Sequence, residues 1–207
     1  MNLRIAKAAS LLNAACVAGF ALSMLFENTL ACYLTAMGIA FSFVPMACAF
    51  RLQARPDARL AGFTAVAFAG MYAAVILLVY FAQVTTVRQG GLSAQAAALL
   101  DFQQFGLLFH YDLMGYGLMA LSTFFAGLTV LPGKREERWL RALLLAHGGF
   151  ALPCFIVPML NLFASSQTPA TGTALLLVWC LYFMPVGVLA FRFFSHRTAL
   201  SAPGTHP

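Results

Sequence analysis

Charged side chains are scarce in this chain: Asp, Glu, Lys and Arg make up 9% of its 207 residues, while 62% are hydrophobic. Soluble domains carry about 25% charged residues, so this scarcity excludes a water-soluble fold. The net charge is +6. Because the basic residues stand in short clusters beside apolar runs, without interleaved aromatics, we interpret them as membrane-topology signals and expect no nucleic-acid partner.

Signature motifs of enzymes and metal sites are also missing. The sequence has no GxSxG, HExxH, glycine-rich phosphate loop or kinase signature, which makes nucleotide use improbable. Its five cysteines form no CxxC or other metal-ligand spacing and all lie within apolar segments. We therefore predict no cofactor, no metal and no disulfide, and we interpret the cysteines as small apolar side chains at helix contacts.

Long apolar stretches are what the sequence has in abundance. A hydrocarbon core of about 30 Å needs about 20 apolar residues per helix. Six stretches qualify, near 5–26, 29–50, 60–84, 112–131, 140–163 and 173–195. The prediction is an all-α protein with one domain of six transmembrane helices over 1–195 and a short polar tail over 196–207. The first span is expected to be an uncleaved helix, with a cleaved secretory signal as the alternative.

The basic residues predict which way the helices face. Eleven of the twelve lie at four places and only Arg88 stands apart; the clusters are Arg4/Lys7, Arg51/Arg55/Arg59, Lys134/Arg135/Arg138/Arg141 and Arg192/Arg197. Basic residues near helix ends stay in the cytoplasm during insertion. We therefore predict that both termini and the loops at 51–59 and 132–141 are cytoplasmic, in a bacterial inner (plasma) membrane.

The connection between the third and fourth spans is the least ordinary segment. Gly90-Gly91 should end the preceding helix, and Ser93 can cap a new one. We predict a single helix through QAAALLDFQQFGLLF, with Leu99 and Phe102 on the same face as Phe105 and Phe109. Such a helix would lie in the extracytoplasmic interface and could act as a lid.

Polar residues near the outer ends of the spans are the candidates for a site, because polar groups in a membrane protein usually face the bundle interior. The candidate catalytic acids are Glu27, Asp101 and Asp112. The candidate ligand-binding residues are Glu27, Gln83, His110, Asp112, His147 and Asn161. The alternative for the acids is solvation by headgroup water, and for His147 a hydrogen-bonded structural role. His110 and Asp112 should not face one another on a continuous helix.

Two stretches resemble the later spans of small uncharacterised bacterial six-helix integral membrane proteins. In 111–130, YDLMGYGLMALSTFFAGLTV carries an aromatic-Asp-Leu-x-Gly-Tyr start, and in 137–160, ERWLRALLLAHGGFALPCFIVPML opens on a Glu-x-Trp loop. The resemblance covers about one third of the chain. It implies the six-helix architecture and carries no assigned activity.

Three functional hypotheses remain open at this point. The first is binding or transport of a small amphipathic or lipid-like molecule through an outward-facing polar cleft, oriented by Glu27, Asp112 and Asn161. The second is a membrane-embedded lipid or isoprenoid isomerase or cyclase that uses a buried carboxyl group for acid-base chemistry. The third is a non-catalytic subunit that packs against a membrane partner or a second copy of the chain through small-residue faces. In all three, the lipid bilayer is itself a partner.

Overall fold

All regular structure in the described residues is helical. The computed structural model describes residues 1–160 and 169–200, with side chains of the last helix given over 172–197. The longer helices are α1 (Asn2–Leu25), α2 (Thr29–Gln53), α3 (Arg59–Ala82), α5 (Leu107–Thr129), α6 (Arg135–His147) and α8 (Pro169–Leu200). The shorter ones are α4 (Ala94–Leu100), α7 (Ala151–Met159), the 3-10 turns Pro56–Ala58, Phe102–Gln104 and Gly148–Phe150, and a π-helical turn, Gln83–Val87.

Five helical segments in this part of the chain are long and apolar enough to cross a membrane. They are Asn2–Leu25, Thr29–Gln53, Pro56–Val87, Arg135–Met159 and Gly172–Arg197. The expectation of an all-α protein with several apolar spans is thereby confirmed. The fourth predicted span, near 112–131, corresponds to α5, which has 23 residues and is not among these five.

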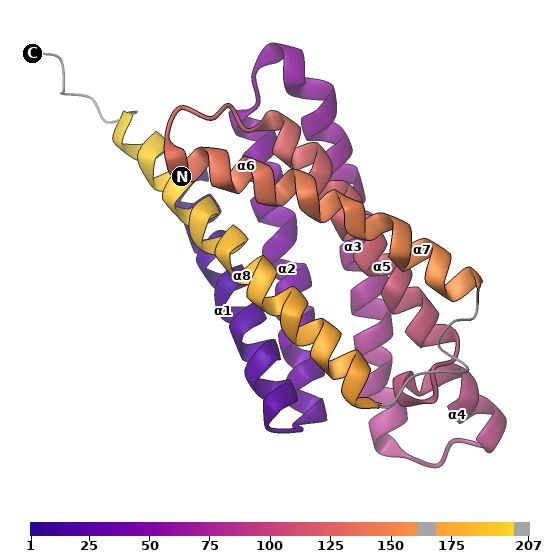
Figure 1. Cartoon of the computed structure of the whole chain (residues 1–207). Coiled ribbons are helices and arrows are strands. Elements are labelled where there is room, and N and C mark those ends of the chain that lie inside the picture. The colour runs from indigo at the N-terminus through magenta and orange to yellow at the C-terminus, as the bar shows by residue number, and fades with distance from the viewer. Residues whose placement is uncertain (161–168, 201–207) are drawn as a thin grey trace, which may run out of the picture.

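Helix α5 lies inside the bundle, between α3 on one side and α6 and α7 on the other (Figure 1). Its glycines allow this close approach. A Cβ atom built on Gly115 would stand 2.9 Å from the Ile76 side chain of α3, and one on Gly117 would stand 2.8 Å from Phe155 of α7. Ser122 also donates a hydrogen bond to the Ala65 carbonyl oxygen of α3 at 2.7 Å. Small residues and interhelical hydrogen bonds of this kind are the usual means of helix association in lipid.

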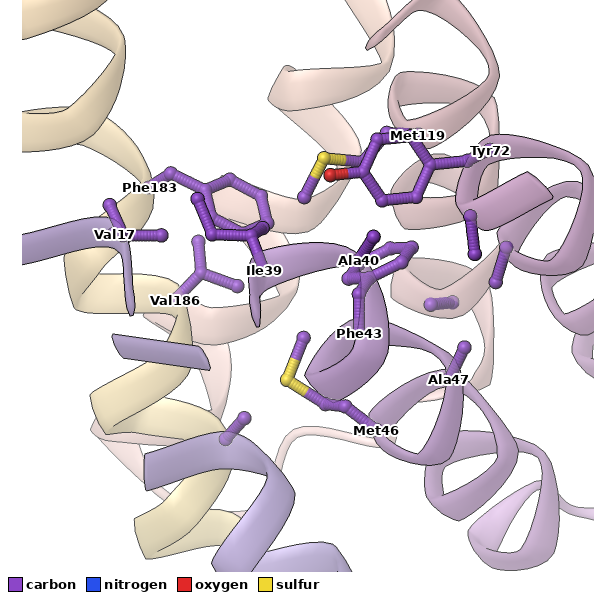
Figure 2. Packing of buried hydrophobic residues seen from close by; sticks show 14 of the residues in the cluster. Val17, Ile39, Ala40, Phe43, Met46, Ala47, Tyr72, Met119, Phe183 and Val186 are labelled. Atoms are coloured by element: carbon purple, nitrogen blue, oxygen red, sulfur yellow. The ribbon is translucent and has the colours of Figure 1, made fainter. Parts of the chain in front are cut away.

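The centre of the bundle is aromatic (Figure 2). Phe43 of α2 packs edge-on against Tyr72 of α3 with ring centroids 5.5 Å apart, and it lies 6.4 Å from Phe183 of α8. Figure 2 shows the Tyr72 hydroxyl pointing toward Met119 of α5. All four side chains are fully or almost fully buried. Four helices that are distant in the sequence therefore meet in one core.

The four basic clusters gather at one end of the bundle. Figure 1 shows the start of α1, the end of α8, the α2–α3 connection and the start of α6 at this end, with α4 at the opposite end. Arg192 of α8 pairs with Glu136 of α6 at 2.9 Å, which joins two of the clusters directly. The predicted loop at 132–141 is wrong in extent: α6 begins at Arg135, because the Glu137 carboxylate accepts hydrogen bonds from the Gly133 and Lys134 amides and caps the helix.

The predicted fifth span is not one continuous α-helix. It divides into α6 and α7 at the 3-10 turn Gly148–Phe150. The break lies one turn before Pro153, whose ring excludes an α-helical hydrogen bond to the Gly149 carbonyl. Pro45 and Pro185, by contrast, lie inside the helices α2 and α8.

The close approach of α1 and α8 at Gly187 can be tested by substitution. A Cβ atom on Gly187 would stand 3.0 Å from both the Ala14 amide nitrogen and the Ser10 carbonyl oxygen, which are backbone atoms that cannot move aside. We expect Gly187→Ala to lower stability by about 1–3 kcal/mol through overpacking, measured as a fall in the melting temperature in detergent.

The matched control is Gly70→Ala on the exposed face of α3, where a Cβ atom meets nothing within 4 Å. Replacing this glycine should leave the melting temperature unchanged or raise it, since alanine is the better helix former by about 1 kcal/mol. Equal melting temperatures for the two variants would contradict a close α1–α8 contact.

Candidate functional site at Asp112

Asp112 is the one predicted acid that the structure places in the interior. It lies in the second turn of α5 and its side chain is buried. Its Oδ1 atom has no hydrogen-bond partner among the described residues. An unpaired buried polar group costs on the order of 1–3 kcal/mol, so such groups are rare and call for an explanation.

Three tyrosines surround this carboxyl group. Tyr72 and Tyr80 lie two turns apart on the face of α3 that packs against α5, and Tyr116 lies one turn beyond Asp112 on α5 itself. The Tyr80 hydroxyl is the one within reach of the Asp112 carboxyl group. Tyr80 is also within reach of the Tyr116 hydroxyl, although neither that hydroxyl nor the Tyr72 hydroxyl makes a hydrogen bond of good geometry in the described part of the chain. We call these four residues the Asp112 cluster.

The cluster is enclosed by aromatic rings. Tyr116 lies 6.1 Å from Tyr72 and 5.3 Å from Trp179 of α8, measured between ring centroids. On the side toward α4, Phe102 lies 5.9 Å from Tyr80. Chemically, the cluster combines one carboxyl group, three phenol hydroxyls and several π faces. Such a set can hold a proton, accept hydrogen bonds from a ligand or coordinate a cation through oxygen.

The segment that covers the cluster differs from the predicted single helix. Ser93 caps α4 as expected, with its hydroxyl accepting from the Ala96 amide at 3.2 Å, but α4 ends at Leu100. Asp101 then caps the 3-10 turn Phe102–Gln104, and Phe105 takes a left-handed conformation before α5 begins at Leu107. The helix is broken because the Asp101 carboxylate accepts from the Gln103 amide at 3.0 Å, which favours a turn over helix continuation.

Gln83 attaches this covering segment to the end of α3. Its amide group donates to the Leu100 carbonyl oxygen at 2.8 Å and accepts from the Phe102 amide at 3.0 Å. Gln83 opens the π-helical turn that follows α3, and its side chain is buried. The side-chain amide of Gln83, predicted to bind a ligand, thus uses both its N–H group and its oxygen atom to hold the backbone of 100–102. We call these two hydrogen bonds the lid anchor.

His147 is also engaged by protein groups. Trp179 Nε1 donates to His147 Nε2 at 3.0 Å, so Nε2 carries no proton. The Nδ1 atom, 2.7 Å from Thr123 Oγ1, must then be the protonated nitrogen, because the Thr123 hydroxyl donates to the Ala120 carbonyl oxygen. The geometry is that of a neutral, fully hydrogen-bonded histidine that joins α5, α6 and α8, which agrees with the structural alternative given by the sequence.

The other candidates are dispersed. Glu27 is exposed in the α1–α2 turn at φ 52°, and Figure 1 places this turn and the start of α5 on opposite sides of the same end of the bundle. Asp101 is half-buried in the covering segment. His110 is half-buried on α5, and Asp112, two residues further along the same continuous helix, is buried. Asn161 lies outside the described residues.

The three tyrosines were missed by the sequence analysis. The available signal was the spacing of Tyr72 and Tyr80, eight residues apart on one helical face, and of Asp112 and Tyr116, four apart on another. Tyrosine carries a hydroxyl group on a large apolar ring, so it does not interrupt an apolar span and escapes a search for polar residues.

One groove formed by the described residues is apolar and lies away from the Asp112 cluster. It has a volume of about 510 Å³ and is lined by Met37, Phe41, Ala74, Leu77, Leu78 and Phe81 of α2 and α3. Among the described residues there is no group of three or more His, Cys, Asp or Glu that could hold a metal ion.

The described fold is that of an all-α, multi-pass membrane protein whose apolar surfaces suit contact with a lipid bilayer. Comparison with protein-family models, with curated proteins and with solved structures returns no match to this chain. The resemblance to six-helix membrane proteins therefore rests on the sequence stretches alone.

If the lid anchor holds the covering segment in place, removing it should speed up hydrogen exchange in that segment. Gln83→Leu removes both hydrogen bonds to the backbone of residues 100–102 while keeping an apolar side chain of similar size. We expect the amides of residues 94–106 to exchange with deuterium about tenfold faster or more, since losing bonds worth about 1 kcal/mol each favours local opening. The measurement is hydrogen exchange of the detergent-solubilised protein by mass spectrometry.

Gln104→Leu is the matched control, because Gln104 is exposed in the same covering segment. Its exchange in residues 94–106 should equal that of the wild type. Unchanged exchange in the Gln83 variant would show that the covering segment is held by its apolar contacts instead.

Proposed function

We propose that the chain crosses the membrane six times, with α5 as the fourth span and α6–α7 together as the fifth, and that both termini are cytoplasmic. Helix α5 is not among the five segments identified by length and composition, but most of its residues are buried, and it packs against α3, α6 and α7. A helix surrounded by protein needs less apolar surface than one that faces lipid. The gathering of all four basic clusters at one end of the bundle supports this orientation.

Reporter fusions in a bacterial host test the topology. A fluorescent protein that folds in the cytoplasm should be bright when fused at either terminus. A phosphatase that is active only outside the cytoplasm should be active when inserted at Gly90-Gly91, where both glycines have positive φ in an exposed connection. Termini on opposite sides of the membrane would mean that one of the six segments does not cross.

We propose that the protein binds, and moves between the two sides of the membrane, a small amphipathic or lipid-like molecule that enters from the outer side beneath the α4 segment. The observation that carries this proposal is the interior position of Asp112 with an unpaired oxygen atom. Ionisable residues inside a membrane bundle are costly and usually mark a substrate or ion pathway. The half-buried Asp101 and His110 would form the rim of the entrance.

A membrane-embedded enzyme is the second candidate. The observation that favours it is the tyrosine set beside Asp112, since a buried carboxyl group and adjacent phenols are suitable groups for proton transfer. In that case a ligand would still bind to the Asp112→Asn variant, but turnover would be lost. The partner-subunit hypothesis needs no site, and it predicts that the protein tolerates this variant without any change in bound small molecules.

The experiment is mass spectrometry of small molecules that co-purify with the protein, compared between wild type and Asp112→Asn. We expect a specific compound to be depleted about tenfold or more in the variant, because a hydrogen bond to a charged group is worth about 1.5 kcal/mol or more. The two proteins are compared at equal melting temperature, so that loss of the compound does not reflect unfolding.

Glu27→Gln is the matched control, since it also removes one carboxylate on the proposed outer side but at an exposed turn. Retention of the compound by this variant places the site at Asp112 alone. Loss in both variants would extend the site to the α1–α2 turn, as the sequence analysis predicts. Identical profiles in all three proteins would contradict the binding proposal.

A further inference from the structure

Arg51 is a basic side chain that two helices hold in place. It lies in the last turn of α2, where the negative end of the helix dipole favours a cation, and its side chain is half-buried. A Cβ atom built on Gly62 of α3 would stand 2.5 Å from Arg51 Cδ, so the missing side chain at Gly62 is what lets the arginine lie across α3. The guanidinium carbon then lies 3.9 Å from the centre of the Phe63 ring. The position of this charged group is therefore set by α2 and α3 together.

No acidic side chain of the described residues neutralises Arg51. Eleven basic and three acidic residues stand at this end of the bundle, which gives it a net charge of +8. The acids are engaged elsewhere: Asp57 pairs with Arg55, Glu136 pairs with Arg192, and Glu137 caps α6. Within the described part of the chain, Arg51 forms neither an ion pair nor a hydrogen bond, and Nε alone of its nitrogen atoms is buried without a partner. The two Nη atoms therefore remain accessible to an anion from outside the bundle.

The contact with Phe63 leaves the guanidinium group ready to bind a phosphate. A cation over a ring uses its flat face, so the N–H groups in its plane remain available as hydrogen-bond donors. The planar fork of arginine matches two oxygen atoms of one phosphate group. Because the ring and the two helices already order the side chain, less conformational entropy is lost when the anion binds.

The surroundings of Arg51 favour a phospholipid over a free phosphate ion. Leu60 and Phe63, near the start of α3, are 79% and 59% exposed. Apolar side chains at the end of a membrane span contact lipid, whereas a free anion gains nothing from them. The ends of a span lie at the level of the headgroups, because its apolar length matches the hydrocarbon core. The net charge of this end of the bundle favours an anionic headgroup over a zwitterionic one.

The apolar groove between α2 and α3 lies further along the same helical faces. Met37 lines it fourteen residues before Arg51, which is close to four turns of α2. Ala74 lines it eleven residues after Phe63, which is about three turns of α3. At 1.5 Å per residue the groove begins about 17 Å from Phe63, and one leaflet contributes about 15 Å to the hydrocarbon core. An acyl chain of a lipid whose phosphate lies at Arg51 thus extends to about the near end of the groove.

We propose that Arg51 binds the phosphate group of an anionic phospholipid from the leaflet on the side of the basic clusters, and that an acyl chain of this lipid lies along α2 and α3 toward the groove. In the topology proposed above, this leaflet faces the cytoplasm. The inference does not rest on the ligand proposed at Asp112, because the α2–α3 connection and the α4 segment that covers the Asp112 cluster lie at opposite ends of the bundle.

The experiment titrates the purified full-length protein in a neutral detergent with dioleoylphosphatidylglycerol and counts the bound lipids by native mass spectrometry. We expect one lipid to bind more tightly than the rest and to raise the melting temperature in a saturable manner, because a ligand of the folded state stabilises it by mass action. Dioleoylphosphatidylcholine has the same chains but no net charge, and it should bind about tenfold more weakly. Inorganic phosphate, which has no chains, should give no saturable rise at the same concentrations.

Three variants locate the site. Arg51→Met keeps an apolar stem beside Gly62 and should weaken the tightest phosphatidylglycerol site by about tenfold, because the charged hydrogen bonds to the phosphate are lost. The matched control is Arg138→Met, which removes the same charge from an exposed position of α6 at the same end and should leave this site unchanged. Phe63→Leu keeps the charge but removes the ring, so it should weaken binding by about threefold. This third variant keeps the test decisive even where Arg51→Met lowers the yield of folded protein.

Three results would overturn the inference. Equal weakening by Arg51→Met and Arg138→Met would mean that the overall charge attracts the lipid without a site at Arg51. Equal binding of the two lipids would mean that chain contacts alone hold them, and inorganic phosphate binding as tightly as phosphatidylglycerol would identify a site for a soluble anion. None of these results affects the comparison of wild type with Asp112→Asn, which leaves Arg51 in place. Conversely, phosphatidylglycerol binding that is kept in Asp112→Asn and lost in Arg51→Met would support the lipid site even where no compound depends on Asp112.

Discussion

The close approach of neighbouring helices to α5 is the contact on which the rest of the bundle depends. In lipid there is little hydrophobic force between helices, so their association relies on van der Waals packing and hydrogen bonds. Gly115 and Gly117 bring α3 and α7 into contact with α5, while Ser122 bonds across to α3. Since α5 is thereby shielded from lipid, it can carry Asp112, the residue around which the candidate site forms.

The sequence predicted where along the bundle axis the ends of the helices lie, but it did not predict which side chains face one another inside the bundle. Apolar length and the basic clusters placed the helix ends well: α2, predicted near 29–50, is Thr29–Gln53, and the clusters do gather at one end. The sequence analysis did not predict the division of the fifth span at Gly148–Phe150 or the end of α4 at Leu100. At both places a local interaction replaces the regular helical hydrogen bond. In one, Pro153 prevents a helical bond, and in the other Asp101 caps a turn.

The residues that form the candidate site were harder to predict from the sequence than the ends of the helices. Glu27 and Asp112 were grouped because both are acids near the outer ends of spans, but a position along the membrane normal does not say on which side of the bundle a residue lies. The order in which helices pack around α5 decides that, and this order places the α1–α2 turn away from α5. The sequence analysis missed the tyrosines for a different reason. Tyr72 and Tyr80 are compatible with an apolar span, and only the packing of α3 on α5 brings them near Asp112.

The covering segment and the Asp112 cluster are joined through one short stretch of α3. Tyr80, which is within reach of Asp112, and Gln83, which holds the backbone at 100–102, are three residues apart, so they lie on neighbouring turns of one face. Phe102 completes the connection, because its amide is bonded by Gln83 and its ring packs on Tyr80. Tyr80 and Gln83 therefore tie the carboxyl group of the cluster and the covering segment to the same end of α3. The π-helical turn Gln83–Val87 begins at this point, so the regular hydrogen-bond pattern of α3 ends where the side chains of the helix turn to the site and its cover.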